Sequence, residues 1–362
     1  YDIEEKTLKL KDGKSFVGDL TITAPEDVSI DLEADASHVV EGDLTVNGAK
    51  DVKVTKLGGG AAAAIQGKAE ISCSGDVILE NWGGSRGDGR NLITNGLTVK
   101  ADTVTTEGGI SGETMIDCIG DIKLGNEHGT TVSKLTVKSA NNVTVTSGSV
   151  NRSIGQDGAE ITCSGIVELD SNRYSYENLG KVSFTQANGK PYVYLMAKSS
   201  EYAKSSEYKD SRITPIPETI EKRYLRIEPR ETYSITVKNG TAQVGEDTTG
   251  LTSAFEGETI TATAPEHDSS ASFSKFEGWK LNKGSINEIV KENGEVVETS
   301  VKDGYIVGED GEKIKEKIIR FKMPGEKVEM TAVYSIPAVV QDLPVIVTGG
   351  TINDTQDTLI RV

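Results

Sequence analysis

Carboxylate side chains recur along the first half of the chain at positions where they could bind a metal ion. Asp51, Asp76 and Asp121 each stand directly before a short apolar segment, within the longer series Asp27, Asp51, Asp76, Thr103, Asp121 and Asn142. Ca²⁺ prefers carboxylate and carbonyl oxygens, so Asp51, Asp76 and Asp121 are the candidate calcium ligands. Asp and Asn also accept backbone hydrogen bonds in turns. Because the chain has no Asp-x-Asp-x-Asp-Gly loop, the turn interpretation is favoured, with calcium as the alternative and no other cofactor expected.

Hydroxyl side chains form a second series, each in the middle of a short strand-like triplet. The series reads Thr21, Thr45, Ser72, Thr98, Asp117, Thr136, Thr162 and Ser183. β-Branched and polar residues of this kind are common on the solvent face of a strand, which is the favoured interpretation. The functional alternative is a flat recognition surface for a repetitive ligand such as a polysaccharide. On that interpretation Thr45, Thr98 and Thr136 are candidate ligand contacts.

A glycine-rich segment from Trp82 to Arg90 supplies the remaining candidate contacts. It contains Arg86, Gly87 and Asp88, an Arg-Gly-Asp triplet that would suit an integrin-type partner and that also arises by chance in a chain rich in Gly and Asp. The ring of Trp82 offers an aromatic plane that could stack on sugar rings or cover an apolar flank. Trp82, Arg86, Asp88 and Arg90 are therefore candidate contacts with a glycan or a host protein.

The three cysteines indicate the element that must position these residues. Cys73, Cys118 and Cys163 lie 45 residues apart within the matching segments Ile71-Ser-Cys-Ser-Gly, Ile116-Asp-Cys-Ile-Gly and Ile161-Thr-Cys-Ser-Gly. Such self-similarity indicates an internal repeat. With the triplets between them, the cysteines give one apolar column, which predicts eight coils: Ile22, Val46, Cys73, Val99, Cys118, Val137, Cys163 and Phe184. Cysteines two coils apart are separated by roughly 9.6 Å, beyond disulfide reach, so we expect small core residues.

Apolar and polar residues alternate within each coil, which is the period of a β-strand. A second strand follows a short corner, and a third apolar site is expected at Val39, Ile65, Ile93, Met115, Val132, Ile154 and Leu179. Stacked coils with matched apolar columns predict an all-β fold, a right-handed parallel β-helix (β-solenoid), over residues 1–198. Leucine-rich repeats are the rival, but no coil has their asparagine-centred leucine spacing or a helical half.

The sequence contains no assembled catalytic motif. It has no clustered histidines and no glycine-rich phosphate loop. We therefore predict no catalytic residues and a non-enzymatic role. Parallel β-helices include polysaccharide lyases and hydrolases, however, and for that alternative Asp76, Asp121, Lys123 and Arg90 are the residues that could share one lateral face.

The repeat ends near Gly189, and residues 199–231, which include Pro215 and Pro217, are predicted to form a cap or linker. A second module is expected at residues 232–335. It carries Phe276-Glu-Gly-Trp279 followed by Phe321-Lys-Met-Pro324. These bulky residues are expected to anchor a small core that has few others. Residues 336–362 form a tail or begin a further repeat.

The two aromatic motifs, in this order, resemble the divergent internalin B-repeat-like family of Gram-positive surface proteins. The resemblance covers less than a third of the chain. It implies a small β-rich, β-grasp-like module that acts as a stalk or protein-contact unit. The N-terminal part resembles right-handed parallel β-helix surface proteins. Together these resemblances imply an extracellular location at a bacterial cell surface or cell wall.

The chain has 362 residues and a formal net charge of −17. An acidic chain repels phosphate backbones, which argues against a nucleic-acid partner. No run approaches the ~18 apolar residues of a membrane helix, so no membrane insertion is expected. We predict a secreted or cell-surface adhesin-like protein that binds a polysaccharide or a host surface or matrix protein along the β-helix, with the second module as a spacer. The alternatives are a carbohydrate-active enzyme and a passive stalk.

Overall fold

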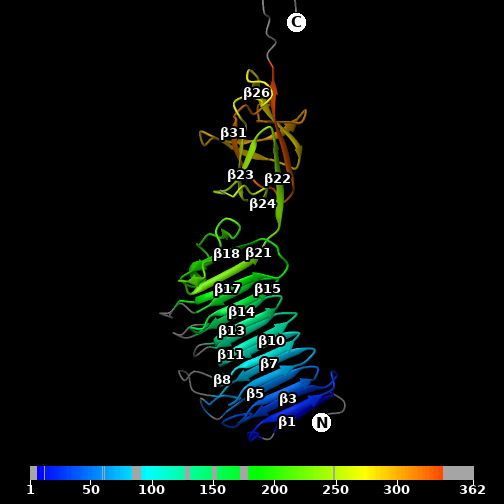
Figure 1. Cartoon of the computed structure of the whole chain (residues 1–362), viewed down its shortest axis with the longest axis vertical. Coiled ribbons are helices and arrows are strands. Elements are labelled where there is room, and N and C mark those ends of the chain that lie inside the picture. The colour runs from blue at the N-terminus through cyan, green and yellow to red at the C-terminus, as the bar shows by residue number, and fades with distance from the viewer. Residues whose placement is uncertain are drawn as a thin grey trace, which may run out of the picture. The chain divides into compact units, whose positions relative to one another are not determined.

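The computed structural model describes residues 6–11, 13–58, 60, 62–83, 91–126, 131–148, 153–171, 178–247 and 249–336. The chain divides into two compact units, Tyr1–Glu231 and Thr232–Val362, and each has its own hydrophobic core (Figure 1). Almost all regular structure is β-strand, because the helix α1 (Ser200–Ala203) has only 4 residues. The all-β prediction is confirmed.

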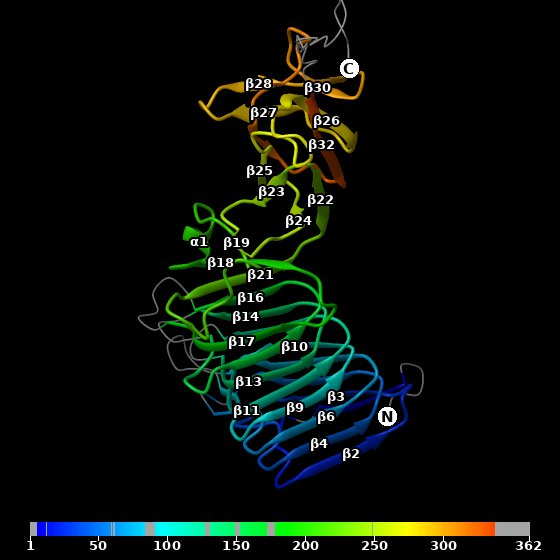
Figure 2. The same cartoon turned by 45° about the horizontal axis from the view of Figure 1, so that its top comes forward.

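The first unit is a β-solenoid whose coils contribute strands to two long sheets (Figure 2). Sheet A contains the parallel strands β1 (Thr7–Lys11), β3 (Ser29–Ala34), β5 (Val52–Lys56), β7 (Asp76–Asn81), β10 (Thr103–Glu107), β12 (Ile122–Asn126), β14 (Val143–Ser147) and β16 (Val167–Asp170). Sheet B contains the parallel strands β2 (Leu20–Ala24), β4 (Leu44–Gly48), β6 (Ala69–Ser72), β9 (Leu97–Ala101), β11 (Gly109–Cys118), β13 (Val132–Ser139), β15 (Ala159–Cys163) and β17 (Gly180–Gln186). In each sheet, six of these strands have a parallel neighbour on both sides. The solenoid therefore has about 6 turns that are flanked by another turn on each side. The parallel β-helix is thus confirmed, and its right-handed sense stays a prediction.

A third, narrower side closes each coil. Single bridges join Phe16 to Val40, Val40 to Ile65, Ile65 to Ile93, and Val132 to Ile154, and Ile110 of β11 pairs with both Ile93 of β8 (Asn91–Ile93) and Val132. Two members of the predicted third column were wrong, because Val40 rather than Val39 and Ile110 rather than Met115 make these contacts. Met115 is partly exposed, since it alternates in β11 with the buried Thr114 and Ile116.

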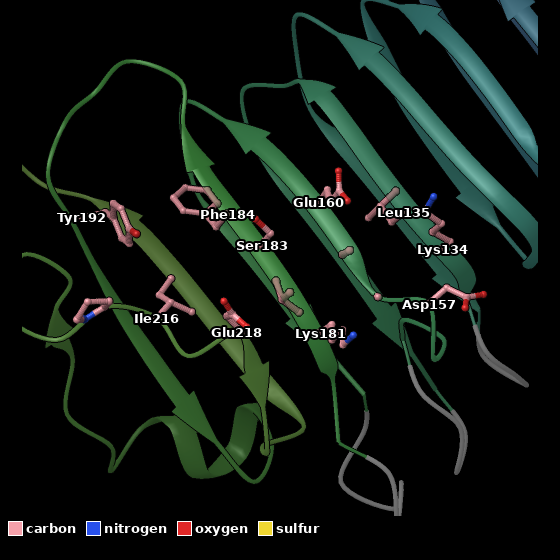
Figure 3. Close-up of a pocket in the computed structure, with 14 residues that line it drawn as sticks. Lys134, Leu135, Asp157, Glu160, Lys181, Ser183, Phe184, Tyr192, Ile216 and Glu218 are labelled. Carbon is pink, nitrogen blue, oxygen red and sulfur yellow. The ribbon is translucent and has the colours of Figure 1, made fainter.

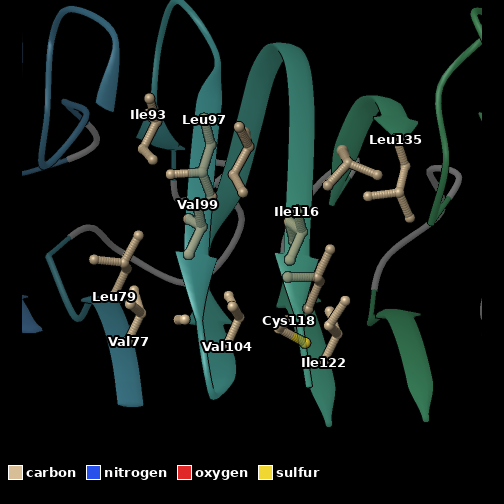
Figure 4. Packing of buried hydrophobic residues seen from close by; sticks show 14 of the residues in the cluster. Val77, Leu79, Ile93, Leu97, Val99, Val104, Ile116, Cys118, Ile122 and Leu135 are labelled. Atoms are coloured by element: carbon tan, nitrogen blue, oxygen red, sulfur yellow. The ribbon is translucent and has the colours of Figure 1, made fainter. Parts of the chain in front are cut away.

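Alternation within the strands places one set of side chains inside the coil. In sheet B the register aligns Ile22, Val46, Ile71, Val99, Ile116, Val137, Ile161 and Phe184. These residues meet apolar side chains from sheet A in one continuous core (Figure 4). The predicted column was therefore wrong in three coils, where it named the residue two positions after the aligned one. The isoleucine of each Ile-x-Cys segment, rather than the cysteine, lies opposite the valines of the neighbouring coils.

The cysteines occupy the next inward position, where the chain turns from sheet B toward sheet A. Cys118 lies in register with Ala101, and a Cβ added at Gly48 in the same corner of an earlier coil would lie 2.1 Å from the carbonyl oxygen of Ala24. Small residues therefore predominate at this corner, although Gln186 occupies it in the last coil. Cys118 and Cys163 are buried, and Cys73 is partly buried. The interpretation of the cysteines as small core residues is confirmed, although their position in the column is not.

Residues 199–231 belong to the first unit and follow its last coil. The strand β21 (Tyr224–Pro229) pairs antiparallel with β16 and with β18 (Tyr192–Ala197), which also pairs with β19 (Lys209–Asp210). The strand β20 (Thr219–Ile220) pairs antiparallel with β17. Arg226 of β21 donates to Glu168 of β16 at 3.0 Å, and the Tyr224 hydroxyl donates to the same carboxylate at 3.0 Å. These antiparallel strands cover the edges that the last coil would otherwise expose.

The second unit is built from two sheets. One has the order β24 (Ser253–Phe255), β22 (Thr232–Lys238), β32 (Val328–Ser335), β26 (Lys275–Lys283), β30 (Tyr305–Val307) and β29 (Ser300–Lys302). The other has the order β23 (Thr241–Val244), β25 (Thr259–Thr263), β31 (Ile318–Lys322), β27 (Glu288–Lys291) and β28 (Val296–Glu298). Phe276, Trp279, Phe321 and Met323 are buried in its core, as predicted, and the Trp279 indole donates to the carbonyl of Glu316 at 2.9 Å. Residues 232–247 and 249–336 contain no helix, and the β-grasp-like prediction is not confirmed.

Candidate functional site

The candidate calcium ligands lie at the corners where coils enter sheet A. Asp51 accepts a hydrogen bond from the backbone N–H of Asp76 in the next coil at 3.0 Å, and one from the Ser29 hydroxyl in the previous coil at 3.0 Å. Asp76 accepts from the Thr103 hydroxyl at 2.6 Å. Asp121 accepts from the side-chain amide of Asn142 at 2.8 Å. Each carboxylate therefore links neighbouring coils.

Glycine precedes the residues whose amides these side chains bind. A Cβ at Gly75 would lie 2.2 Å from Asp51 Oδ1, and a Cβ at Gly165 would lie 2.3 Å from Asn142 Oδ1. The side-chain oxygens thus reach the next coil only because glycine leaves room. Burial disfavours the charged form of Asp51, but hydrogen bonds from Asp76 and Ser29 outweigh it and lower the pKa of the carboxyl. Among the residues that the structure describes, no group of three or more His, Cys, Asp or Glu side chains could hold a metal ion.

The residues named for the enzyme alternative do not share a hollow. Asp76 is the first residue of β7 and Asp121 directly precedes β12, with β10 between these two strands of sheet A. Lys123 is exposed on the outer face of β12. Asp76, Asp121 and Lys123 are not among the lining residues of the two hollows of the solenoid. Arg90 lies outside the described residues.

Trp82 lies directly after β7, at one end of sheet A, and is 47% exposed. Its backbone N–H donates to the carbonyl of Lys56 at 2.8 Å, and its indole donates to Glu80 at 3.4 Å. The candidate contacts Arg86, Asp88 and Arg90 lie outside the described residues. Trp82 belongs to the sheet A side of the coil, so the structure does not bring it together with Thr45, Thr98 and Thr136 of sheet B.

Buried polar side chains hold the chain in place next to Trp82, at this end of sheet A. Lys56 is fully buried, and its ammonium donates to the carbonyl of Gly60 at 2.7 Å; burial lowers its pKa. The side-chain amide of Asn81 donates to the carbonyl of Asn91 at 2.6 Å and to that of Ala62 at 3.2 Å. These bonds replace the backbone ladder where the chain leaves the sheets, so we assign Lys56 and Asn81 a structural role.

The hydroxyl series occupies the outer face of sheet B, but it is interrupted. Thr45, Thr98 and Thr136 are partly exposed there, as predicted for a solvent face. The register gives the outward column Thr21, Thr45, Glu70, Thr98, Met115, Thr136, Glu160 and Ser183. The predicted continuous row of hydroxyls was wrong at Ser72, Asp117 and Thr162, which lie two residues further along their strands. Glu70 therefore stands between Thr45 and Thr98, Met115 stands between Thr98 and Thr136, and Glu160 follows Thr136.

Two hollows lie along this face of sheet B, and the second also reaches Phe184 of the inward column. One has a volume of about 340 Å³ and includes Glu70, Thr98, Met115 and Asp117 among its lining residues. The other has a volume of about 450 Å³ and lies along β13, β15 and β17, next to residues 215–218 (Figure 3). Both volumes fall in the range of roughly 300–1,000 Å³ that is typical of ligand sites. We call the second one the cap hollow.

The cap hollow combines an aromatic wall with charged side chains. Phe184 and Tyr192 are both half-buried, and their rings meet edge to face with centroids 5.0 Å apart. Figure 3 shows these rings on the side of Ile216, while Glu160 and Lys134 come from the strands on the other side. Burial raises the pKa of Tyr192, which keeps its hydroxyl neutral. The hollow therefore offers both an apolar surface and hydrogen-bonding groups.

Sequence reasoning missed the residues of the cap hollow. Glu160 would have entered the outward column if the coils had been aligned on Ile161 rather than on Cys163. Tyr192 and Ile216 come from segments beyond the repeat, and no spacing relates them to β17.

No helix within the described part of the chain is long and apolar enough to cross a membrane. In comparisons with known proteins, the chain matches no family model, no curated protein and no solved structure. The resemblance of residues 232–335 to the internalin B-repeat-like family therefore stays a prediction.

Proposed function

We propose that the first unit is a non-catalytic recognition module that binds a polysaccharide along the outer face of sheet B. The observation that carries this proposal is the pair of hollows on one face, lined by threonines, carboxylates and, in the cap hollow, an aromatic pair. Hydroxyl and carboxylate groups pair with sugar hydroxyls, and aromatic rings pack against the apolar faces of sugar rings.

The geometry of the face suits a polymer. Neighbouring strands of a sheet are about 4.8 Å apart, so the eight parallel strands of sheet B extend over roughly 34 Å. Thr45, Thr98 and Thr136 repeat along this direction in strands β4, β9 and β13. A chain molecule that crosses the strands meets similar groups at regular intervals, whereas a small ligand would use only one hollow.

The wider role follows from the proposed binding and from the resemblances. The protein would act as an adhesin-like protein in the extracellular space or at a bacterial cell surface, and the partner would be a polysaccharide or a glycan-bearing host surface or matrix protein. The second unit, with its separate core, would act as a spacer. The right-handed sense of the solenoid and the β-grasp-like character of the second unit belong to the same proposal.

The test is binding of the full chain to an array of plant, mucin and bacterial glycans, once with calcium and once with a chelator. Selective binding in both buffers supports the proposal. Release of new reducing ends or unsaturated products would instead support a lyase or hydrolase, and silence on every glycan would support a passive stalk. The Trp82→Ala variant serves as a control on the sheet A side and is expected to bind as the wild type does.

A further inference from the structure

The lining of the cap hollow carries more negative than positive side chains. Its lining contains three carboxylates, from Asp157, Glu160 and Glu218, and two lysines, Lys134 and Lys181. The ammonium of Lys134 is already engaged, because it donates to Glu113 outside the hollow at 2.7 Å. Its charge is therefore largely neutralised before any ligand arrives.

The three carboxylates have no such close partner. Among the described residues, no side-chain hydrogen bond or ion pair within 4 Å holds the carboxylates of Asp157, Glu160 or Glu218, and all three residues are exposed. Lys134 attracts Asp157 and Glu160 only at longer range. Lys181 is the one remaining cation of the lining, so the hollow keeps a net negative charge. The net charge of the whole chain, −17, adds to the same field and concentrates cations near the surface.

The aromatic pair places a second, independent requirement on the chemistry of the ligand. The rings of Phe184 and Tyr192 are half-buried, pack against the end of the solenoid core and contribute to the lining of the hollow. Aromatic rings attract cations that lie over their faces and pack against apolar ring surfaces. A ligand that satisfies both the carboxylates and the rings carries a positive charge on a compact, partly apolar ring.

We propose that the cap hollow binds de-N-acetylated amino-sugar units, whose protonated amines pair with Glu160 and Glu218 while the sugar ring packs against Phe184 and Tyr192. This proposal rests on the proposed function and specifies the class of glycan. It also accounts for the difference between the two hollows. In the other hollow, Glu70 is already paired with Lys68, so that hollow offers less free negative charge.

The experiment compares glucosamine oligomers with N-acetylglucosamine oligomers of equal length, by calorimetry on the full chain. The glucosamine oligomer is expected to bind at least tenfold more tightly, since a charge-assisted hydrogen bond changes affinity by roughly tenfold. Glu160→Gln and Glu218→Gln should each weaken this binding by roughly tenfold. Glu107→Gln is the matched control, because Glu107 is an exposed carboxylate of β10 in sheet A and lines neither hollow.

Two further arms separate the amine from the sugar. Oligolysine of similar charge is expected to bind more weakly than the glucosamine oligomer, and Phe184→Leu should weaken the glucosamine oligomer but not oligolysine. Equal binding of both amino-sugar forms would overturn the amine assignment and leave the glycan-binding function standing. Equal or tighter binding of oligolysine would overturn it in favour of a cationic peptide. Failure to bind any glycan would remove the proposed function as well.

Discussion

The hydrogen bond from Asp51 to the next coil gives a quantitative test of how the corners are held together. Asp51→Ala removes the acceptors of the Asp76 amide and the Ser29 hydroxyl, both at 3.0 Å. A hydrogen bond to a charged group contributes roughly 1.5–3 kcal/mol, and the side chain of Asp51 is 36% exposed, so water replaces part of each bond. We expect a loss of about 2 kcal/mol in the free energy of unfolding of the solenoid, or about 30-fold in its equilibrium constant.

Asp51→Asn is the matched variant, because an amide oxygen keeps the acceptor. Asn142 already accepts from the backbone N–H of Ile166 at 2.7 Å at the equivalent corner of a later coil. This variant should lose less than about 1 kcal/mol, the difference between a charged and a neutral acceptor. The assay is urea unfolding followed by circular dichroism, in a Trp82→Phe background where the fluorescence of Trp279 reports on the second unit alone. That second transition should not move.

A calcium site would give a different pattern. If Asp51 binds calcium, then Asp51→Asn should be as harmful as Asp51→Ala, and calcium should raise the melting temperature of the wild type but not of either variant. That result would refute the hydrogen-bond account.

The pH dependence of the solenoid's stability gives an independent test of the same hydrogen bonds. Because the pKa of Asp51 is lowered in the folded state, its contribution is present above the unfolded value of about 3.8 and is lost as the pH falls through the folded pKa. The advantage of the wild type over Asp51→Asn should therefore disappear in acid.

Three further predictions concern packing and reactivity. Gly75→Ala should destabilise the solenoid by about 1–3 kcal/mol in urea unfolding, because its Cβ would lie 2.2 Å from Asp51 Oδ1, whereas Gly125→Ala, whose nearest atom is at 3.6 Å, should have little effect. Burial raises the pKa of Cys118 to about 12, so iodoacetamide at mildly alkaline pH should label it only after denaturation, as mass spectrometry would detect. Trp279→Ala should cost the second unit about 3–5 kcal/mol, because the ring is fully buried, and should leave the solenoid transition in circular dichroism unchanged. Labelling of folded Cys118, or a shift of the solenoid transition in Trp279→Ala, would contradict these assignments.

The sequence predicted the solenoid because its coils repeat a visible pattern, but it misplaced the columns within the coil. Ile71 and Cys73 both point inward, since residues two apart in a strand lie on the same face. Apolarity alone therefore cannot tell which of them lies opposite Val46. The strand register decides, because it pairs Val46 with Ile71 and Cys118 with Ala101. The resulting two-residue slip put Ser72, Asp117 and Thr162 where Glu70, Met115 and Glu160 stand.

The cap hollow was beyond sequence reasoning for a different reason. Its wall joins Phe184 of the last coil to Tyr192, Ile216 and Glu218, which follow the repeat. These residues meet because β20 pairs antiparallel with β17, and β21 pairs antiparallel with both β16 and β18. The periodicity of the repeat does not predict which later segments of the chain pair with the last coil. At two corners, by contrast, the hydrogen bonds agree with the turn interpretation, since Asp51 and Asn142 accept from backbone amides of the next coil.

The most direct test of the account is a pair of arginine substitutions in one coil. Thr98 in β9 lies on the outer face of sheet B and lines a hollow there, and Thr105 in β10 lies on the outer face of sheet A. Both threonines are partly exposed, so both variants should fold. Binding of the glycan selected on the array should fall by roughly tenfold or more in Thr98→Arg and stay unchanged in Thr105→Arg. Unchanged binding in Thr98→Arg, or a loss confined to Thr105→Arg, would contradict the assignment of sheet B as the ligand face.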